Sequence, residues 1–404
     1  MPVPTFLRVA LVGLVVLECF LHTCPARGQQ DVSDFLAQFE REQMEDRRKS
    51  SPAYVTTLLE MPRNHGGLFA LDTTPDGGML AGGTGKVTVT TDGHKEVFGG
   101  EVVLWDGKSG KLVATLGNHQ PASVTYVKFA NRDRILVSAS DDNLLVQVWD
   151  VRKRSRISQF TLKGPWSQQC PPAITPRGRY IANVTTEEQT FGDREMVTQA
   201  DLTVSSAATG KTVWTHPQAA VSCLSFNGDG ARLIGAIHRT EWTQEGDRVR
   251  GKQKELALAG WETKTGKELW KKPLKKRPAI LLVVPNHPNL VLGFSGSRVW
   301  GWDASSGDLL SEVKLTGKDP LSLGEVAVSS DLSVLAIVNF MATKIGLYNL
   351  KTGEELHHAK VKFPDEFDNA AFTADLKSMV CDYGVNVGSA VIDVNQLFQA
   401  AAAP

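Results

Sequence analysis

The sequence of 404 residues predicts an all-β protein made of seven repeated units. The first supporting observation is Val102–Lys111, in which four strand-forming residues precede a Trp-Asp corner and a tight Ser-Gly-Lys turn. The second is that six related segments follow at intervals of about 40 to 56 residues. The third is that each unit carries an upstream strand, turn and strand, as in Leu68–Gly83. Four short strands per unit of this length are typical of a β-propeller. The seven corner positions are Trp105, Trp149, Ser205, Trp261, Trp302, Tyr348 and Ile392.

The first 28 residues are interpreted as a signal peptide. Arg8 supplies the only side-chain charge of the n-region, Val9–Leu17 is an apolar core, and Ala26-Arg27-Gly28 offers small residues at the spacing a signal peptidase reads. The apolar run is too short to predict a transmembrane helix. Two alternatives stay open, an uncleaved signal anchor and a lipidated Cys24. We therefore expect a secreted or periplasmic protein that contacts a membrane only if the leader is retained or lipidated.

Composition and cysteine content narrow the function classes. The 44 basic and 44 acidic residues cancel, which argues against a general nucleic-acid or anionic-membrane surface. Loss of the leader would leave Cys170, Cys223 and Cys381, an odd number scattered over different units. These three cysteines predict no disulfide framework and are expected to be small buried hydrophobic side chains.

Two short segments precede the first repeat. Within residues 29–50, Asp31–Arg48 places Val32, Phe35, Leu36 and Phe39 at helical spacing, which predicts a helical spacer. Ala53–Glu60 has the character of a strand but no corner motif of its own. No linker rich in Pro, Gly or Ser separates the units that follow, so residues 51–404 are predicted to form one propeller.

The repeats resemble the WD-repeat family from about Tyr54 to Phe398. The second unit is the most similar: His119, Ser138 or Ser140, Asp141 or Asp142, and Trp149 match the positions at which that family builds a buried hydrogen-bond network. The resemblance implies that Ala53–Glu60 closes the last blade as its outer strand. It also implies structural roles for the repeat positions Trp105, Asp106, His119, Trp149, Asp150, Trp261, Trp302 and Asp303. The third and sixth units depart from the pattern at Ser205 and Tyr348-Asn349 and are expected to rely on packing.

Units 1, 3 and 4 carry long connections between their second and third strands. Each connection is centred on a two-residue turn signal, Asp92-Gly93, Gly192-Asp193 or Gly246-Asp247, that suits a tight hairpin. We therefore expect three projecting hairpins on one face. In the fourth unit the turn predicts that Trp242 pairs with Gly251 and that Ala236 pairs with Ala257.

Aromatic and charged side chains on these hairpins are the candidate binding residues. Phe98, Phe191 and Trp242 either stack across their own hairpins or contribute to a recognition surface. Under the second hypothesis the partner-binding residues are Phe191, Glu188, Trp242, Arg248 and Arg250. The partner is expected to be another protein.

A second resemblance competes with the first. Ala208–Trp214 and Lys264–Trp270 are similar to the repeats of quinoprotein-type propellers, in which a Trp four residues after the turn Gly docks one blade on the next. Only two units carry this Trp, those propellers usually have eight blades, and no set of cofactor ligands matches. There is also no zinc spacing, EF-hand loop, phosphate-cradling glycine loop or nucleophile elbow.

These observations predict a monomeric, non-catalytic, extracytoplasmic protein-interaction scaffold with no metal or cofactor. The alternative is an extracytoplasmic enzyme or quinoprotein-like redox protein that uses the central funnel. Three or more convergent carboxylates or histidines in that funnel, with room for a metal, would favour the enzyme.

Overall fold

The computed structural model divides the chain into two compact units, Met1–Pro52 and Ala53–Pro404. It describes residues 51–62, 67–89, 95–131, 134–140, 142–163, 170–191, 194–245, 248–284, 286–317, 325–339, 344–360, 369–382 and 389–402, and the single residues Gln38, Glu42, Glu45 and Lys49. These four single residues are helical and exposed. The predicted leader lies outside the described residues and stays a prediction. Among the described residues, no helix is long and apolar enough to cross a membrane.

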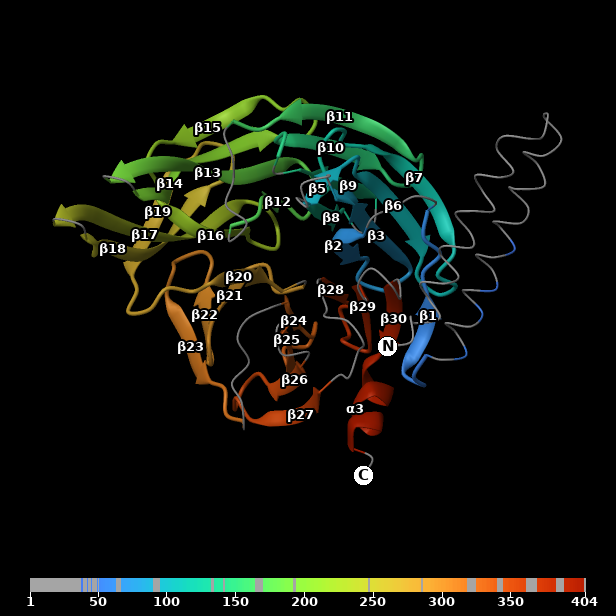
Figure 1. The fold of residues 1–404 in the computed structure, drawn as a ribbon. Helices are drawn as coiled ribbons and strands as arrows, with labels where there is room; N and C mark the ends of the chain where they lie inside the picture. The colour runs from blue at the N-terminus through green and yellow to red at the C-terminus, as the bar shows by residue number, and fades with distance from the viewer. Residues whose placement is uncertain are drawn as a thin grey trace, which may run out of the picture. The chain divides into compact units, whose positions relative to one another are not determined.

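The second unit is a seven-bladed β-propeller, as the sequence predicts. Its blades are antiparallel four-stranded sheets arranged around a central axis (Figure 1). Blade 1 contains β2 (Leu68–Thr73), β3 (Met79–Thr84), β6 (Glu101–Asp106) and β7 (Leu112–Asn118). Blade 2 contains β8 (Tyr126–Ala130), β9 (Ile135–Ala139), β10 (Leu145–Asp150) and β11 (Ser155–Thr161). Blade 3 contains β12 (Ala173–Ile174), β13 (Tyr180–Phe191), β14 (Arg194–Ser206) and β15 (Thr212–His216).

The remaining blades repeat this order. Blade 4 contains β16 (Val221–Phe226), β17 (Arg232–Glu245), β18 (Arg248–Glu262) and β19 (Glu268–Pro273). Blade 5 contains β20 (Ile280–Val283), β21 (Leu290–Ser295), β22 (Arg298–Asp303) and β23 (Leu309–Lys314). Blade 6 contains β24 (Glu325–Val328), β25 (Val334–Asn339), β26 (Lys344–Asn349) and β27 (Glu355–Lys360). Blade 7 contains β28 (Ala370–Phe372), β29 (Ser378–Asp382), β30 (Ser389–Asp393) and β1 (Val55–Leu58).

Burial explains why the third strands are the most recognisable part of each repeat. In β6, Val102–Trp105 is buried without interruption, and β10, β22 and β26 show the same pattern of four buried residues between half-buried ends. These strands are covered on both sheet faces by neighbouring blades, so they are continuous apolar runs and not alternating ones. The outer strands are largely exposed, as in β11 and β23. The three cysteines Cys170, Cys223 and Cys381 are buried and free, and burial raises the pKa of each thiol.

Blade 7 joins the two ends of the propeller unit. β1 runs antiparallel to β30, with Leu58 opposite Ala390, and the Leu59 backbone N–H donates to the Ser389 carbonyl at 2.8 Å. β30 ends at Asp393 because a helix begins at the next residue. The sequence analysis did not predict this helix, α3 (Val394–Ala402). The Asp393 carboxylate accepts a hydrogen bond from the Gln396 N–H at 2.9 Å and so caps α3.

Two tryptophans dock one blade on the next in the way that the quinoprotein resemblance implies. Trp214 Nε1 donates to the Thr263 carbonyl at 2.7 Å, and Trp270 Nε1 donates to the Ala304 carbonyl at 3.2 Å. The Trp214 ring lies on Gly266, which has φ +73°, and a Cβ on that glycine would lie 2.7 Å from the ring. Glycine therefore serves both the turn and the close approach of the indole.

Candidate interaction face

The second blade contains the hydrogen-bond network expected from the WD-repeat resemblance. His119 Nε2 and Trp149 Nε1 each lie 2.9 Å from Ser138 Oγ, which identifies Ser138 and not Ser140 as the serine of the network. His119 is fully buried, and burial lowers the pKa of its imidazole to about 4. The turn contributes Asn143, whose side-chain amide donates to the His119 carbonyl at 2.8 Å. Asp141 lies outside the described residues. These contacts join the β7–β8 connection to β9, β10 and the turn between them.

The other repeat positions also face the inside of the fold. Trp105, Trp261 and Trp302 are buried, and the Trp105 indole N–H donates to the Glu60 carbonyl. The aspartates that follow the corner cap the tight turns: Oδ1 accepts from a backbone N–H at 2.8 Å for Asp106, 2.9 Å for Asp150 and 3.0 Å for Asp303. Ser205, Tyr348 and Ile392 occupy the corner position in blades 3, 6 and 7, and they too are buried.

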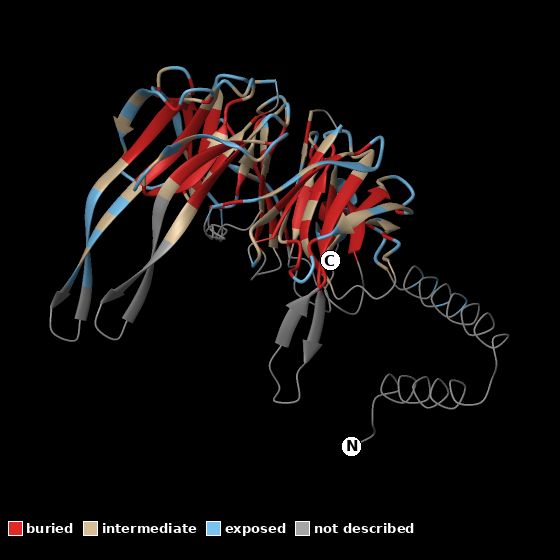
Figure 2. Ribbon diagram, turned by 90° about the horizontal axis from the view of Figure 1, so that it is seen from above, coloured by how far each residue is buried: buried red, intermediate tan, exposed pale blue. Residues whose placement is uncertain are grey.

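Three hairpins project from one end of the blades. They are formed by β4 (Lys86–Val89) with β5 (Lys95–Phe98), by β13 with β14, and by β17 with β18. β17 and β18 have 14 and 15 residues, whereas β9 and β10 of blade 2 have 5 and 6. Figure 2 shows the long hairpins of blades 3 and 4 extending beyond their blades in the same direction. We call this surface the hairpin face.

The register of the fourth hairpin agrees with the prediction at its tip but not at its base. Trp242 lies opposite Gly251, as predicted. Ala236 lies opposite Leu258, so its predicted pairing with Ala257 is wrong by one residue. The reason is a β-bulge between Arg239 and Thr240, which leaves one extra residue on β18. Turn geometry determines register only as far as the first bulge.

Trp242 and Arg239 form contacts within the fourth hairpin, and Arg239 also contacts the connection between β15 and β16. The half-buried indole lies over Gly251, where a Cβ would approach the ring to 2.6 Å. Arg239 pairs with Glu255 at 3.6 Å and donates to the Gln218 carbonyl at 2.9 Å. These contacts stiffen the hairpin and hold Trp242 in place.

The remaining candidate binding residues are placed only by their backbones. Glu188 lies opposite Val197, Phe191 opposite Arg194, and Arg248 opposite Glu245, while their side chains lie outside the described residues. Arg250 is exposed on β18. The structure therefore gathers these positions near the tips of two adjacent hairpins. The side chain of Phe98 likewise lies outside the described residues.

A second group of charges, not identified from the sequence, lies at the centre of the ring. Lys128 Nζ on β8 pairs with Asp72 Oδ1 on β2 at 2.8 Å, and Asp72 Oδ2 accepts the Phe129 N–H at 2.7 Å. Burial raises the pKa of Glu325 on β24 to about 7, with Lys128 opposing the shift and Asp72 adding to it. Since β8 and β24 belong to blades 2 and 6, this interaction crosses the channel. Charged residues in otherwise apolar first strands are the sequence signal that could have identified the group.

The channel group contains two carboxyl groups and one ammonium. Asp72 is nearly buried, whereas 51% of the Lys128 side chain is exposed, so water reaches the ammonium. Within the described ranges there is no group of three or more His, Cys, Asp or Glu side chains that could hold a metal ion.

Comparisons with known protein families match this chain to a WD-repeat model and to a second propeller-related model. The family model described as WD domain, G-beta repeat matches residues 110–150, and the model described as outer membrane protein assembly factor BamB matches residues 198–390. No curated protein sequence matches the chain significantly.

Solved structures confirm the fold. A chain of the mitotic checkpoint complex matches with a TM-score of 0.56 at 13% identity, covering 85% of this chain and 94% of that one. The Cps50 (Swd1) β-propeller domain of Myceliophteria thermophila matches with a TM-score of 0.58 at 14% identity, covering 82% of this chain and 100% of that one.

Proposed function

We propose that this protein is a non-catalytic, extracytoplasmic protein-interaction scaffold whose partner binds the hairpin face. The observation that carries the proposal is the length of β13–β14 and β17–β18. Blade 2 completes its sheet with much shorter strands, so the extensions contribute nothing that blade packing requires. Neutral length drift is the competing explanation, because surface insertions cost little free energy.

The described part of the fourth hairpin has the chemistry of a binding surface. Trp242 presents a half-buried indole on one face of a stiffened strand pair, and Arg250 is exposed on the opposite face, next to Gly251, the cross-strand partner of Trp242. Trp and Arg are the residue types that carry most interface energy. A rigid hairpin also loses little conformational entropy on binding. Phe191, Glu188 and Arg248 are proposed to extend this surface toward the third hairpin.

The names of the matched proteins support both parts of the proposal. One similar chain is part of a multiprotein complex, and the model that matches residues 198–390 is named for an outer membrane protein assembly factor. Both descriptions concern assembly with other proteins, and the second names the outer membrane. The predicted signal peptide favours an extracytoplasmic location.

Trimming the fourth hairpin tests the binding face. His238 and Leu256 are cross-strand partners below the bulge, so a two-residue turn between them removes the extension and leaves the blade paired. We expect the melting temperature to stay within a few degrees of the full chain, while capture of the partner found by pull-down from the native compartment weakens at least about tenfold. Undiminished capture by a variant with all three hairpins trimmed would refute the hairpin face as the site.

The alternative function, an enzyme or redox protein that uses the central channel, is favoured by the Asp72–Lys128–Glu325 group alone. Under our proposal these residues stabilise the ring by joining blades 1, 2 and 6. The purified chain incubated with pyrroloquinoline quinone and calcium should therefore show neither tight binding nor dye-linked alcohol oxidation. Micromolar binding would favour the alternative.

A further inference from the structure

A cavity of about 360 Å³ lies between blades 2 and 3. Its residues come from the β8–β9 and β12–β13 turns, from the start of the β14–β15 turn and from β9, β10 and β11. Along antiparallel strands these turns lie at the opposite end of blade 3 from the β13–β14 hairpin. The cavity is therefore separate from the hairpin face, and its volume falls within the range of about 300 to 1,000 Å³ typical of ligand pockets.

Blades 2 to 5 form three successive junctions, and a docking tryptophan closes two of them. The cavity lies at the third, between blades 2 and 3, which has no such tryptophan. Trp214 and Trp270 close the junctions that follow, and the residue at the same repeat position in blade 2 is Ser158. Ser158 Oγ donates at 2.5 Å to the Ala207 carbonyl, which corresponds to the carbonyls that accept the two indoles. The hydrogen bond between the blades is thus kept, whereas the ring that covers the turn glycine of the next blade comes from Phe160, which lies on Gly210 as Trp214 lies on Gly266. Ser158 is also the cross-strand partner of Val148, which lines the cavity.

Hydrogen bonds between blades 2 and 3 and within blade 3 fix the walls of the cavity. The Asn131 N–H donates to the Pro176 carbonyl at 2.6 Å, and the Ala207 N–H donates to the Arg179 carbonyl at 2.9 Å. Together with the Ser158 bond, these contacts hold the turns around the cavity. A cavity with fixed walls does not need to order its own backbone when a ligand binds.

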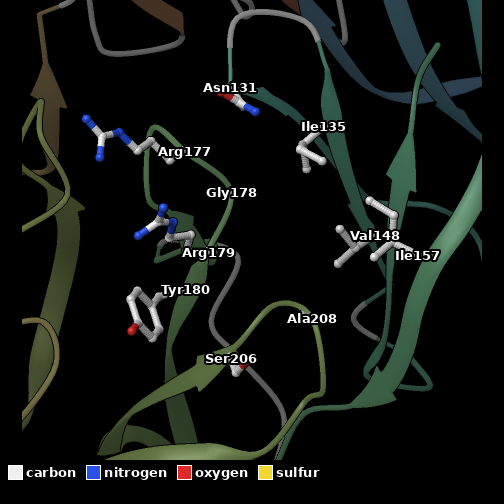
Figure 3. Close-up of a pocket in the computed structure, with 10 residues that line it drawn as sticks. All are labelled: Asn131, Ile135, Val148, Ile157, Arg177, Gly178, Arg179, Tyr180, Ser206 and Ala208. Carbon is white, nitrogen blue, oxygen red and sulfur yellow. The ribbon is translucent and has the colours of Figure 1, made fainter.

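The two sides of the cavity differ chemically. Ile135, Val148 and Ile157 form one side, and Arg177, Arg179 and Tyr180 form the other (Figure 3). Ile157 is the extra residue of a β-bulge in β11, and 47% of it is exposed. Both arginines are exposed, and within the described part of the chain neither guanidinium has an ion pair or hydrogen bond. The cavity thus combines an apolar wall with two cations that lack acceptors.

We propose that this cavity binds an acidic peptide segment of a partner protein, with one aromatic side chain inserted against Ile135, Val148 and Ile157. These three residues offer an apolar wall on which an aromatic ring can pack, since 47% of Ile157 is exposed. The arginines at the rim add charge complementarity, because carboxylates on either side of the aromatic residue can form bidentate pairs with guanidinium groups. The site is independent of the hairpin face and supplies a second docking point.

Direct binding of designed peptides tests the proposal. The probe is a short fluorescein-labelled peptide with a single tryptophan between pairs of glutamates, measured by fluorescence anisotropy on the full chain. We expect affinity at least about tenfold higher than for matched peptides in which alanine replaces the tryptophan or lysine replaces the glutamates. Equal affinity for all three peptides would overturn the proposal. Equally tight binding of free N-acetyl-tryptophan would overturn the assignment to a peptide.

Two variants locate the site. Ile157→Glu, at an exposed residue of the apolar wall, should keep the melting temperature close to that of the parent and weaken probe binding at least about tenfold. If this variant does not fold, the double variant Arg177→Glu/Arg179→Glu serves the same purpose, since both side chains are exposed. It should lose the acidic probe, whereas Lys275→Glu/Lys276→Glu carries the same charge change on the β19–β20 connection and should not. Unchanged binding by the arginine variant would refute the proposal.

The hairpin-trimmed chain separates this site from the proposed function. It should bind the peptide probe with unchanged affinity, because the cavity lies at the other end of the blades. If the trimmed chain no longer binds the peptide probe, the placement of the site is wrong. This result is independent of whether the trimmed chain still captures the natural partner.

Discussion

Burial of His119 makes blade 2 sensitive to acid, and the size of the effect follows from the structure. The His119 imidazole is fully buried, and no charged side chain among the described residues pairs with it. Its pKa therefore falls from 6.5 in the unfolded chain to about 4 in the folded chain. The difference of about 2.5 pKa units corresponds to about 3 kcal/mol. Between pH 6.5 and 4 the unfolded chain binds a proton that the folded chain does not. Stability therefore rises with pH across this window and is lost as the pH falls through it.

The comparison that isolates this effect is between the parent chain and His119→Gln. Glutamine keeps an amide near Nε2, where it can still bond Ser138, but it does not titrate. The free energy of unfolding, measured by urea titration with tryptophan fluorescence, should fall with acid more steeply in the parent. Relative to pH 7.5, the difference between the two proteins should change by about 2.5 kcal/mol at pH 4.5.

Other groups titrate in the same range but cancel in this difference. Glu325 has a raised pKa of about 7, so its protonated form is favoured in the folded state and its contribution has the opposite sign, being lost as pH rises. It is unchanged in the variant. A difference between the parent and His119→Gln that does not vary with pH would refute the reasoning and would mean that the folded blade accepts the imidazolium.

Three further predictions concern the ends of the chain and the blade junctions. Deleting Ala53–Glu60 exposes the edge of β30 and removes the carbonyl that accepts the Trp105 indole N–H, so we expect aggregation or a large drop in melting temperature. Deleting Asp31–Arg48 should lower the melting temperature far less. Equal stability of the two deletion variants would contradict this assignment. If the leader is cleaved, the intact mass of protein from its native compartment should correspond to a chain that begins near Gln29, and a chain that retains Met1 or starts at a lipidated Cys24 would argue against cleavage. Trp270→Ala should lower the free energy of unfolding by about 3 kcal/mol, because the indole docks blade 4 on blade 5. The control Leu269→Ala, at an exposed neighbouring position, should change it by about 0.5 kcal/mol or less. Similar values for the two variants would argue against docking by the indole.

The hairpins show where sequence patterns stop being informative about the candidate site. Two-residue turn signals predicted that Trp242 lies opposite Gly251, because the turn directly sets the pairs nearest to it. The bulge at Arg239 and Thr240 has no comparable local signal, and so the pairing of Ala236 was predicted wrongly. Helix α3 escaped prediction for a related reason: Leu397 and Phe398 are buried by packing against the blades, and so short an apolar segment carries no periodicity long enough to be recognised.

The sequence by itself determined the number of blades, the strands within them and the structural role of the corner residues. These features repeat, and each follows from local rules: a run of apolar residues for a strand covered on both faces, and a Gly or Asp where a tight turn needs it. Only the tertiary structure decided which side chains from different blades meet. The Asp72–Lys128 pair, the acid-sensitive His119 and the cavity beside Ser158 each join residues of different strands or blades. Closure of the ring sets those distances, and no local pattern along the chain records them.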